Sequence, residues 1–303
     1  MHVFLTGANG FIGGVVIERL QHNGHTVTGL ARNDTAAATL QSRGVTPVQG
    51  SLQDTDTLTR VAREAEAVLH LGFGKGQDAI ETDRKAVEAF LVGLASSNKP
   101  LIYTSGSMVT GDSGDSITDE STPLDTKGAT AWRGRHEQVA LAGTERGVRA
   151  LVIRPASIVH GRSGGGTILG LLKSAREDGA ARYVGNGENR KSPVHVEDLA
   201  NLYVLALERA TAGQVFIGAS DEIVTQKAVA EAASRAAGAG GKTVSWTLEE
   251  ARKAIGFLAD IQAMNGVVSS AKARHMLEWN PQGPTLLSEL DSGSYRHPEA
   301  ASS

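Results

Sequence analysis

The chain has 303 residues, enough for one large domain or for a nucleotide-binding domain with a smaller lobe. Hydrophobic residues make up 40% and charged residues 21%, as in an ordinary soluble enzyme, and the net charge of −3 without a basic block argues against nucleic acid as a partner. The absence of cysteine excludes disulfides, a thiol nucleophile and a cysteine-ligated metal. No apolar run is long enough to span a bilayer and Met1 leads directly into a core strand, so we expect a cytoplasmic protein without membrane contact.

The first twenty residues read as a strand, a glycine-rich turn and a helix. His2 to Leu5 is a short buried strand, and apolar residues at helical spacing follow the turn. Glycine at position 7 permits a tight turn, at position 10 lets a pyrophosphate approach the backbone, and at position 13 lets the helix pack close to the sheet. A bare turn that merely uses glycine is the alternative, but the pattern favours dinucleotide binding by Gly7, Asn9, Gly10, Phe11, Ile12 and Gly13.

The G-x-x-G-x-x-G spacing, preceded by Thr6, resembles that of the extended and atypical short-chain dehydrogenase/reductases, a superfamily that includes NAD-dependent epimerases and dehydratases. The resemblance extends from Met1 to about Tyr295 and implies an α/β fold, a doubly wound and mainly parallel Rossmann sheet with a small C-terminal substrate lobe. We expect a cofactor-binding core at 1–161, a C-terminal part at 162–295 that adds sheet strands and the lobe, and a tail at 296–303.

The second strand, Thr26 to Leu30, ends at Ala31 and Arg32. The family often has Asp at position 31, where a carboxylate would bind the ribose 2′-hydroxyl, whereas the guanidinium of Arg32 suits a 2′-phosphate. NADP(H) is therefore favoured and NAD(H) remains possible; a solvated loop arginine is the alternative. Ser51 departs from the family's Asp at the adenine site, and Leu52 is expected to cover the adenine.

The fourth strand, Ala67 to Leu71, continues into Gly72-Phe73-Gly74-Lys75. By resemblance, Leu71, Gly72 and Phe73 line the adenosine and pyrophosphate, and Lys75 either reaches a phosphate or is a solvated lysine.

The fifth strand and the residues after it, Tyr103 to Gly111, resemble the family's Y-[ST]-S-S-x-x-V-Y-G run. In that run the second serine bonds the reacting oxygen, but its position here is Gly106, with Ser105 and Ser107 on either side. We expect one of these two serines to donate to the reacting oxygen and Thr104 to lie at the cofactor.

The family's Tyr-x-x-x-Lys pattern has no tyrosine here in either register. One register places Ala129 and Arg133 at the two positions, and the other places Trp132 and His136 there. Arg133 is expected to hold the cofactor ribose or a phosphate, although a guanidinium is a poor proton donor. Histidine is a common general acid or base, so His136 is a candidate catalytic group, with an exposed helical histidine as the alternative.

Two later runs also resemble the family. Arg154 to Gly161 matches R-P-x-x-V-Y-G, which implies that Pro155, Ser157 and Ile158 contact the nicotinamide. The run from Ser192 to Ala200 matches V-H-V-x-D-L-A, which implies that Val194 and His195 form a strand returning to the sheet and that Asp198 helps to start a helix. Between them, 183–189 reads as a turn.

The sequence thus predicts an NADP(H)-dependent oxidoreductase that reduces a carbonyl of a small or medium organic molecule by hydride transfer. A dinucleotide-binding sensor or scaffold with little redox turnover is the second hypothesis, and epimerase or dehydratase chemistry is a third. A small-molecule substrate is the expected partner, no metal is expected, and a homodimer is possible.

Overall fold

The fold is built around one parallel sheet. A computed structural model describes residues 1–74 and 76–296. Seven strands pair in the order β11-β6-β5-β4-β1-β2-β3, and every pairing is parallel. Their bounds are β1 His2–Thr6, β2 Thr26–Ala31, β3 Thr46–Gln49, β4 Ala67–His70, β5 Pro100–Thr104, β6 Arg149–Pro155 and β11 Val215–Gly218. The chain builds outward from β1 to β3 and then crosses back to β4, so the strand order reverses between β1 and β4, where ligands bind in such sheets.

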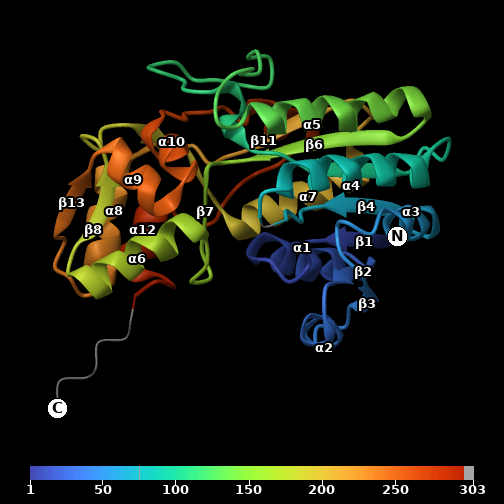
Figure 1. Cartoon of the computed structure of the whole chain (residues 1–303), viewed down its shortest axis with the longest axis horizontal. Helices are drawn as coiled ribbons and strands as arrows, with labels where there is room; N and C mark the ends of the chain where they lie inside the picture. Colours follow the sequence, from blue (N-terminus) through green and yellow to red (C-terminus); the bar gives the residue numbers. More distant parts are fainter. Residues whose placement is uncertain (75, 297–303) are drawn as a thin grey trace.

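Helices cover both faces of this sheet (Figure 1). Alternate strand residues face opposite cores, so that Leu5 and Ile102 join one cluster while Phe4 and Tyr103 join the other. The first cluster includes residues of α1 (Phe11–His22), α2 (Asp34–Gln41), α7 (Val196–Arg209) and α11 (Ala271–Leu277). The second includes residues of α3 (Thr55–Glu64), α4 (Ala79–Leu94) and α5 (Ala131–Leu141).

The C-terminal part forms a smaller lobe beside the carboxyl ends of the strands (Figure 1). Its helices are α6 Gly166–Asp178, α8 Gln226–Ala236, α9 Leu248–Ile255, α10 Leu258–Ala263 and α12 Leu286–Ser292. Three two-stranded sheets complete the described lobe and its junction, namely β7 (Ile158–His160) with β10 (Pro193–His195), β9 (Arg190–Lys191) with β12 (Val224–Thr225), and β8 (Ala181–Val184) with β13 (Thr243–Trp246). Two 3-10 turns, η1 (Ser107–Thr110) and η2 (Ala142–Arg146), follow β5 and α5.

Side-chain caps explain where several helices begin. Asn33 accepts a hydrogen bond from the Ala36 amide at 2.8 Å at the start of α2, and Thr225 accepts one from Ala228 at 3.2 Å at the start of α8. Thr247 and Glu250 form a reciprocal capping box on α9. These contacts satisfy amides that the first helical turn leaves without partners.

The doubly wound α/β fold is confirmed, and the part after residue 161 supplies β11 and α7 to the main sheet domain as well as the lobe. Two local expectations are wrong. Val194 and His195 lie in β10, which pairs with β7 outside the central sheet, and the turn expected at 183–189 begins only at 185, because 183–184 belongs to β8. Asp198 lies in the first turn of α7, as expected of a residue that helps to start the helix, but the capping side chain is that of His195, and the Asp198 carboxylate accepts from the amides of Gln282 and Gly283 at 2.9 and 2.8 Å.

Apart from residue 296, the expected tail at 296–303 lies outside the described residues. Within residues 1–74 and 76–296, no helix combines the length and the apolar character that crossing a membrane requires.

Candidate active site

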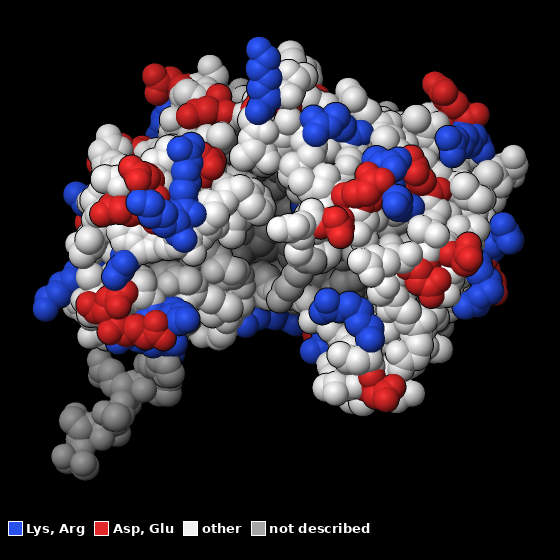
Figure 2. Space-filling model, in the orientation of Figure 1, with Lys and Arg blue, Asp and Glu red and all other residues white. Residues whose placement is uncertain are grey.

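A large cleft opens at the carboxyl ends of the strands, between the sheet domain and the lobe. Its volume is about 930 Å³. Figure 2 shows this side of the molecule hollowed between the two parts, with a rim formed mainly by residues other than Lys, Arg, Asp and Glu. The sequence-predicted residues that line the cleft are Gly7, Asn9, Gly10, Phe11, Ile12, Gly13, Arg32, Leu52, Leu71, Gly72, Phe73, Thr104 and Ser157.

The glycine loop between β1 and α1 forms the middle of the cleft. Gly7 has a φ of 72°, and a Cβ there would lie 2.8 Å from the Gly72 nitrogen. A Cβ on Gly13 would lie 2.2 Å from the Gly7 carbonyl oxygen, so helix and loop can approach this closely only without a side chain. Gly10 caps α1 without a side-chain bond, and no acidic residue occupies the first turn. The exposed amides and the positive end of the helix therefore fit a pyrophosphate.

One end of the cleft has the groups expected around an adenosine. Arg32 follows β2 and is exposed, with no ion-pair partner among the described residues. Asn9 donates to the Ala36 carbonyl at 3.1 Å and so fixes the loop against α2. Leu52 lines the cleft, and so does Ser51, the residue that replaces the family's Asp at the adenine site.

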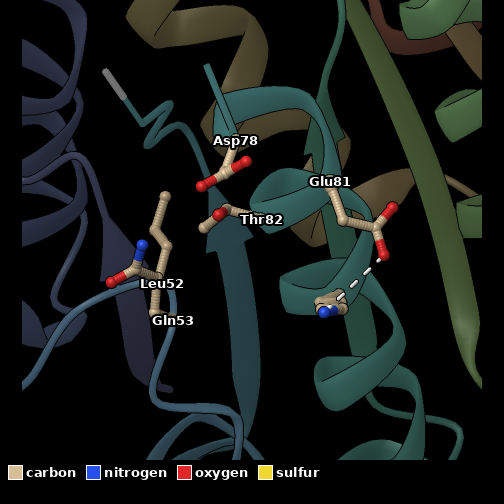
Figure 3. A pocket seen from close by; sticks show the side chains of 6 residues that line it. Leu52, Gln53, Asp78, Glu81 and Thr82 are labelled. Carbon is tan, nitrogen blue, oxygen red and sulfur yellow. Dashed lines mark ion pairs between the residues drawn. The ribbon is translucent and has the colours of Figure 1, made fainter. Parts of the chain in front are cut away.

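A shallow hollow of about 270 Å³ adjoins this end (Figure 3). Leu52, Gln53, Asp78 and Thr82 line both spaces, while Glu81 turns toward Lys85 at 3.8 Å. Sequence reasoning missed the polar groups of Gln53, Asp78 and Thr82. Asp78 lies just before α4, in the segment that follows β4 at the carboxyl end of the sheet. This place in the chain is the one sequence feature that could have indicated a role for Asp78 at the cleft.

The other end of the cleft lies over β5 and β6. Thr104 ends β5, Ser157 follows β6, and the chain from Gly165 to Thr167 closes this end from the lobe side. The Ser157 hydroxyl is buried and has no hydrogen-bond partner among the described residues. Since the adenosine end lies over β2, this opposite end is where a nicotinamide and a substrate would meet.

The two predicted serines lie beside the cleft but do not line it. Ser105 and Ser107 are buried, and neither hydroxyl has a partner within the described part of the chain. Pro155 ends β6, and Ile158 packs into the hydrophobic cluster of the lobe with Ile168 and Leu172. Predicted Lys75 lies outside the described residues.

Arg133 is held at the nicotinamide end by stacking and by one hydrogen bond. Its guanidinium lies 4.4 Å from the centre of the Trp132 ring and 5.2 Å from that of Phe73, and the two rings stack at 5.0 Å. Its Nη1 donates to the Thr104 carbonyl at 3.0 Å. Arg133 thus fixes the backbone of a residue that lines the cleft.

Neither interpretation of His136 is correct. It is not exposed, as the alternative proposed, and it does not line the cleft, as a catalytic group would. It is buried, and its Nδ1 lies 2.6 Å from the Asp83 carboxylate on α4. Asp83 also accepts from the Tyr103 hydroxyl at 2.9 Å and faces His70 Nε2 at 3.3 Å. Burial alone would raise the pKa of Asp83, but the hydrogen bonds to His136 and His70 outweigh it and hold that pKa below its ordinary value of 3.8.

This buried cluster connects elements rather than facing a ligand. His70 Nδ1 lies 2.6 Å from the Thr6 hydroxyl, which accepts from the Gly72 amide at 3.0 Å. A second buried pair joins α5 to β6, where Arg154 donates to both oxygens of Glu137 at 2.9 and 2.7 Å. Both arrangements brace the sheet and its helices under the cleft.

Fold and cleft together define a dinucleotide-binding α/β protein of the Rossmann type. The chain belongs to the NAD dependent epimerase/dehydratase family, whose model matches residues 3–218. It is similar over 97% of its length to an uncharacterized protein of Schizosaccharomyces pombe, with 34% identity and the whole of that protein covered.

Two further comparisons describe the family's range. A 4-hydroxy-2-methyl-3-oxo-4-farnesyl-3,4-dihydroquinoline-1-oxide ketoreductase of Stigmatella aurantiaca is 27% identical over 71% of this chain and 67% of its own. The structure of the UDP-glucose 4-epimerase of Thermotoga maritima superposes with a TM-score of 0.80, 19% identity and 97% of both chains covered. The family and these relatives are enzymes, and the superposition supports the fold.

Proposed function

We propose that this protein is an NADP(H)-dependent oxidoreductase that reduces a carbonyl group of a small or medium organic molecule. The observation that carries the proposal is the composition of one continuous cleft. A glycine loop suited to a pyrophosphate lies in its middle, an exposed arginine at one end and hydroxyl groups at the other. A nicotinamide bound there supplies the hydride.

Arg32 supports the preference for NADP(H). Its guanidinium lies where the chain leaves β2, and the residue before it is Ala31 rather than a carboxylate that would repel a phosphate. A planar guanidinium pairs well with phosphate oxygens. NAD(H) is the alternative cofactor, since an arginine at this position does not exclude it.

The residues at the nicotinamide end suit a reduction. Addition of hydride to a carbonyl carbon leaves negative charge on the oxygen, which then takes a proton to give the alcohol. Thr104 and Ser157 are hydroxyl-bearing residues at this end that can donate to such an oxygen or to the nicotinamide carboxamide. The described charged residues that line the cleft, Arg32 and Asp78, lie at the adenosine end. This distribution suits an uncharged carbonyl compound, because no described charged residue lines the nicotinamide end.

The test is a fluorescence titration with NADPH and NADH, followed by absorbance assays of NADPH oxidation on the same sample. Benzaldehyde, acetophenone, phenylglyoxal and ethyl acetoacetate form the first carbonyl panel. We expect tighter binding of NADPH than of NADH, with NADPH consumed in the presence of at least one carbonyl. Failure to bind either nucleotide would refute the proposal.

A sensor or scaffold is the second candidate. It is favoured by two observations: α5 contains no tyrosine, and His136 binds Asp83 and does not face the cleft. Tight NADPH binding without consumption on a broad carbonyl panel would favour this second function.

A further inference from the structure

A pair of hydroxyl groups connects the floor of the cleft to helix α7. The Thr104 side-chain oxygen lies 2.7 Å from the hydroxyl oxygen of Tyr203. Tyr203 lies in the middle of α7 and is fully buried in the hydrophobic cluster between that helix and the sheet. Thr104 is half-buried and lines the cleft. The pair therefore joins an enclosed phenol to a residue that a ligand can reach.

The hydrogen in this pair has one favourable direction. Each hydroxyl has one hydrogen to donate. Within the described residues, Tyr203 has no hydrogen-bond partner other than Thr104, so a Tyr203 hydrogen pointing elsewhere would be buried without an acceptor. An unsatisfied buried donor costs about 1–3 kcal/mol. Tyr203 accordingly donates, Thr104 accepts, and the Thr104 hydrogen is left to point into the cleft.

The backbone of Thr104 is fixed from the opposite face of the sheet. Arg133 on α5 donates to the Thr104 carbonyl at 3.0 Å, while Tyr203 approaches from α7. Ser105 and Ser107 lack comparable support, since their hydroxyls have no partner among the described residues and do not line the cleft. Burial raises the pKa of Tyr203 well above its ordinary value, although the bond to Thr104 and the charge of Arg133 oppose this, so Tyr203 keeps its hydrogen at neutral pH.

We propose that Thr104 donates the hydrogen bond to the reacting carbonyl oxygen, and that Tyr203 is a positioning residue that orients the Thr104 hydroxyl for this contact. This rests on the proposed reductase function. The hydrogen bond from Tyr203 also polarises the Thr104 hydroxyl and makes it a stronger donor, as in other hydrogen-bonded chains. The pair would stabilise charge on the oxygen as hydride arrives, and solvent that enters the open cleft would supply the proton of the alcohol.

The experiment uses substitutions that remove single hydroxyls. Thr104→Val and Tyr203→Phe keep the shape of each side chain, and Thr104→Ser keeps the donor. Tyr103→Phe is the matched control, because it removes an equally buried tyrosine hydroxyl whose partner is Asp83 on the other face of the sheet. The readouts are the NADPH dissociation constant, the unfolding midpoint, and kcat and KM with whichever of the four panel carbonyls the wild-type protein reduces.

We expect Thr104→Val to lower kcat about 100-fold, as loss of one donor to a developing oxyanion does. Tyr203→Phe should lower kcat about tenfold with NADPH affinity within twofold of wild type, because one mispositioned donor loses part of that stabilisation. The double variant should be no slower than Thr104→Val, since Tyr203 acts through Thr104. Thr104→Ser should keep most of the activity, and Tyr103→Phe should change the unfolding midpoint but not kcat.

Three results would overturn the inference, and they differ from failure of the proposed function. If Thr104→Val has the wild-type kcat, Thr104 does not donate to the reacting oxygen. If Thr104→Val is slow but Tyr203→Phe has the wild-type kcat, Tyr203 does not position Thr104. Additive losses in the double variant would make the two effects independent. If wild type binds NADPH but transfers no hydride to any carbonyl of the panel, the reductase function itself fails and the inference fails with it.

Discussion

The closest approach in the glycine loop gives a quantitative prediction for Gly13→Ala. The new Cβ would lie 2.2 Å from the Gly7 carbonyl oxygen and 2.9 Å from the Gly7 carbonyl carbon. Both are backbone atoms, so the loop or the start of α1 must move by about 1 Å to restore ordinary contact distances of about 3.5 Å. Such overpacking costs about 1–3 kcal/mol. The displaced backbone belongs to the loop assigned to the pyrophosphate, so NADPH affinity should drop about 5- to 150-fold.

Gly14→Ala is the matched control on the next residue of the same helix. Its Cβ would meet only the Arg43 guanidinium, at 2.9 Å, which is the movable end of a long side chain. Alanine also favours the helix by about 0.5–1 kcal/mol over glycine. We expect this variant to bind NADPH like wild type and to unfold at the same or higher denaturant concentration.

The assay is a fluorescence titration with NADPH, run beside denaturant unfolding of the same samples. Wild-type affinity in Gly13→Ala would refute the assignment of this loop to the cofactor. An equal loss of affinity in both variants would show that the helix, not the Gly7–Gly13 contact, governs binding.

Three other substitutions, one of them with a matched control, test the cofactor preference and the two buried polar clusters. Arg32→Asp should weaken NADPH much more than NADH in the same titration, because it replaces a phosphate partner by a like charge; an unchanged ratio would remove Arg32 from cofactor selection. Asp83→Asn should lower the free energy of unfolding at pH 7 by about 1–3 kcal/mol, because it removes the charged acceptor that faces the buried His136 ring and the Tyr103 hydroxyl. The pKa of Asp83 is held below its ordinary value of 3.8, so this contribution is complete above about pH 4 and is lost as the pH falls through the lowered pKa. The difference in free energy of unfolding between Asp83→Asn and wild type, measured by urea unfolding, should therefore become smaller in acid. A difference that is constant with pH would contradict an ionised Asp83. Glu137→Gln should cost about 3–5 kcal/mol by leaving Arg154 with a neutral partner, whereas Glu64→Gln, in an exposed pair with Arg60, should leave the unfolding midpoint unchanged. Equal midpoints for the last two variants would contradict the role assigned to the buried pair.

Local patterns in the sequence were sufficient to predict the parallel sheet and the glycine loop in the middle of the cleft. The strand, turn and helix around Gly7, Gly10 and Gly13 are contiguous in the chain, and their geometry follows from residue size and spacing. The seven parallel strands follow from alternating apolar runs and helices in the same way. The short pairings of β10 and β8 could not be predicted, because β8 pairs with β13 about sixty residues later and neither strand carries a distinctive pattern.

The arrangement of side chains at the nicotinamide end could not be predicted, because it depends on contacts between residues far apart in the sequence. The burial of His136 follows from Asp83, which lies 53 residues earlier and packs against it from α4. Tyr203 is one of several large residues on the buried face of α7, and only its 2.7 Å contact with Thr104, 99 residues away, distinguishes it from core packing. A family resemblance indicated where a catalytic group is usual but could not indicate which hydroxyl reaches the cleft in this chain.

The proposed function requires that this cleft transfer a hydride from NADPH to a carbonyl carbon. The most direct measurement is incubation of the protein with NADPH dideuterated at nicotinamide C4 and the carbonyl panel, with mass spectrometry of the products. We expect an alcohol that carries one deuterium on the former carbonyl carbon and that does not form when the protein is omitted. Saturating NADPH binding with no deuterated alcohol from any carbonyl of the panel would contradict it.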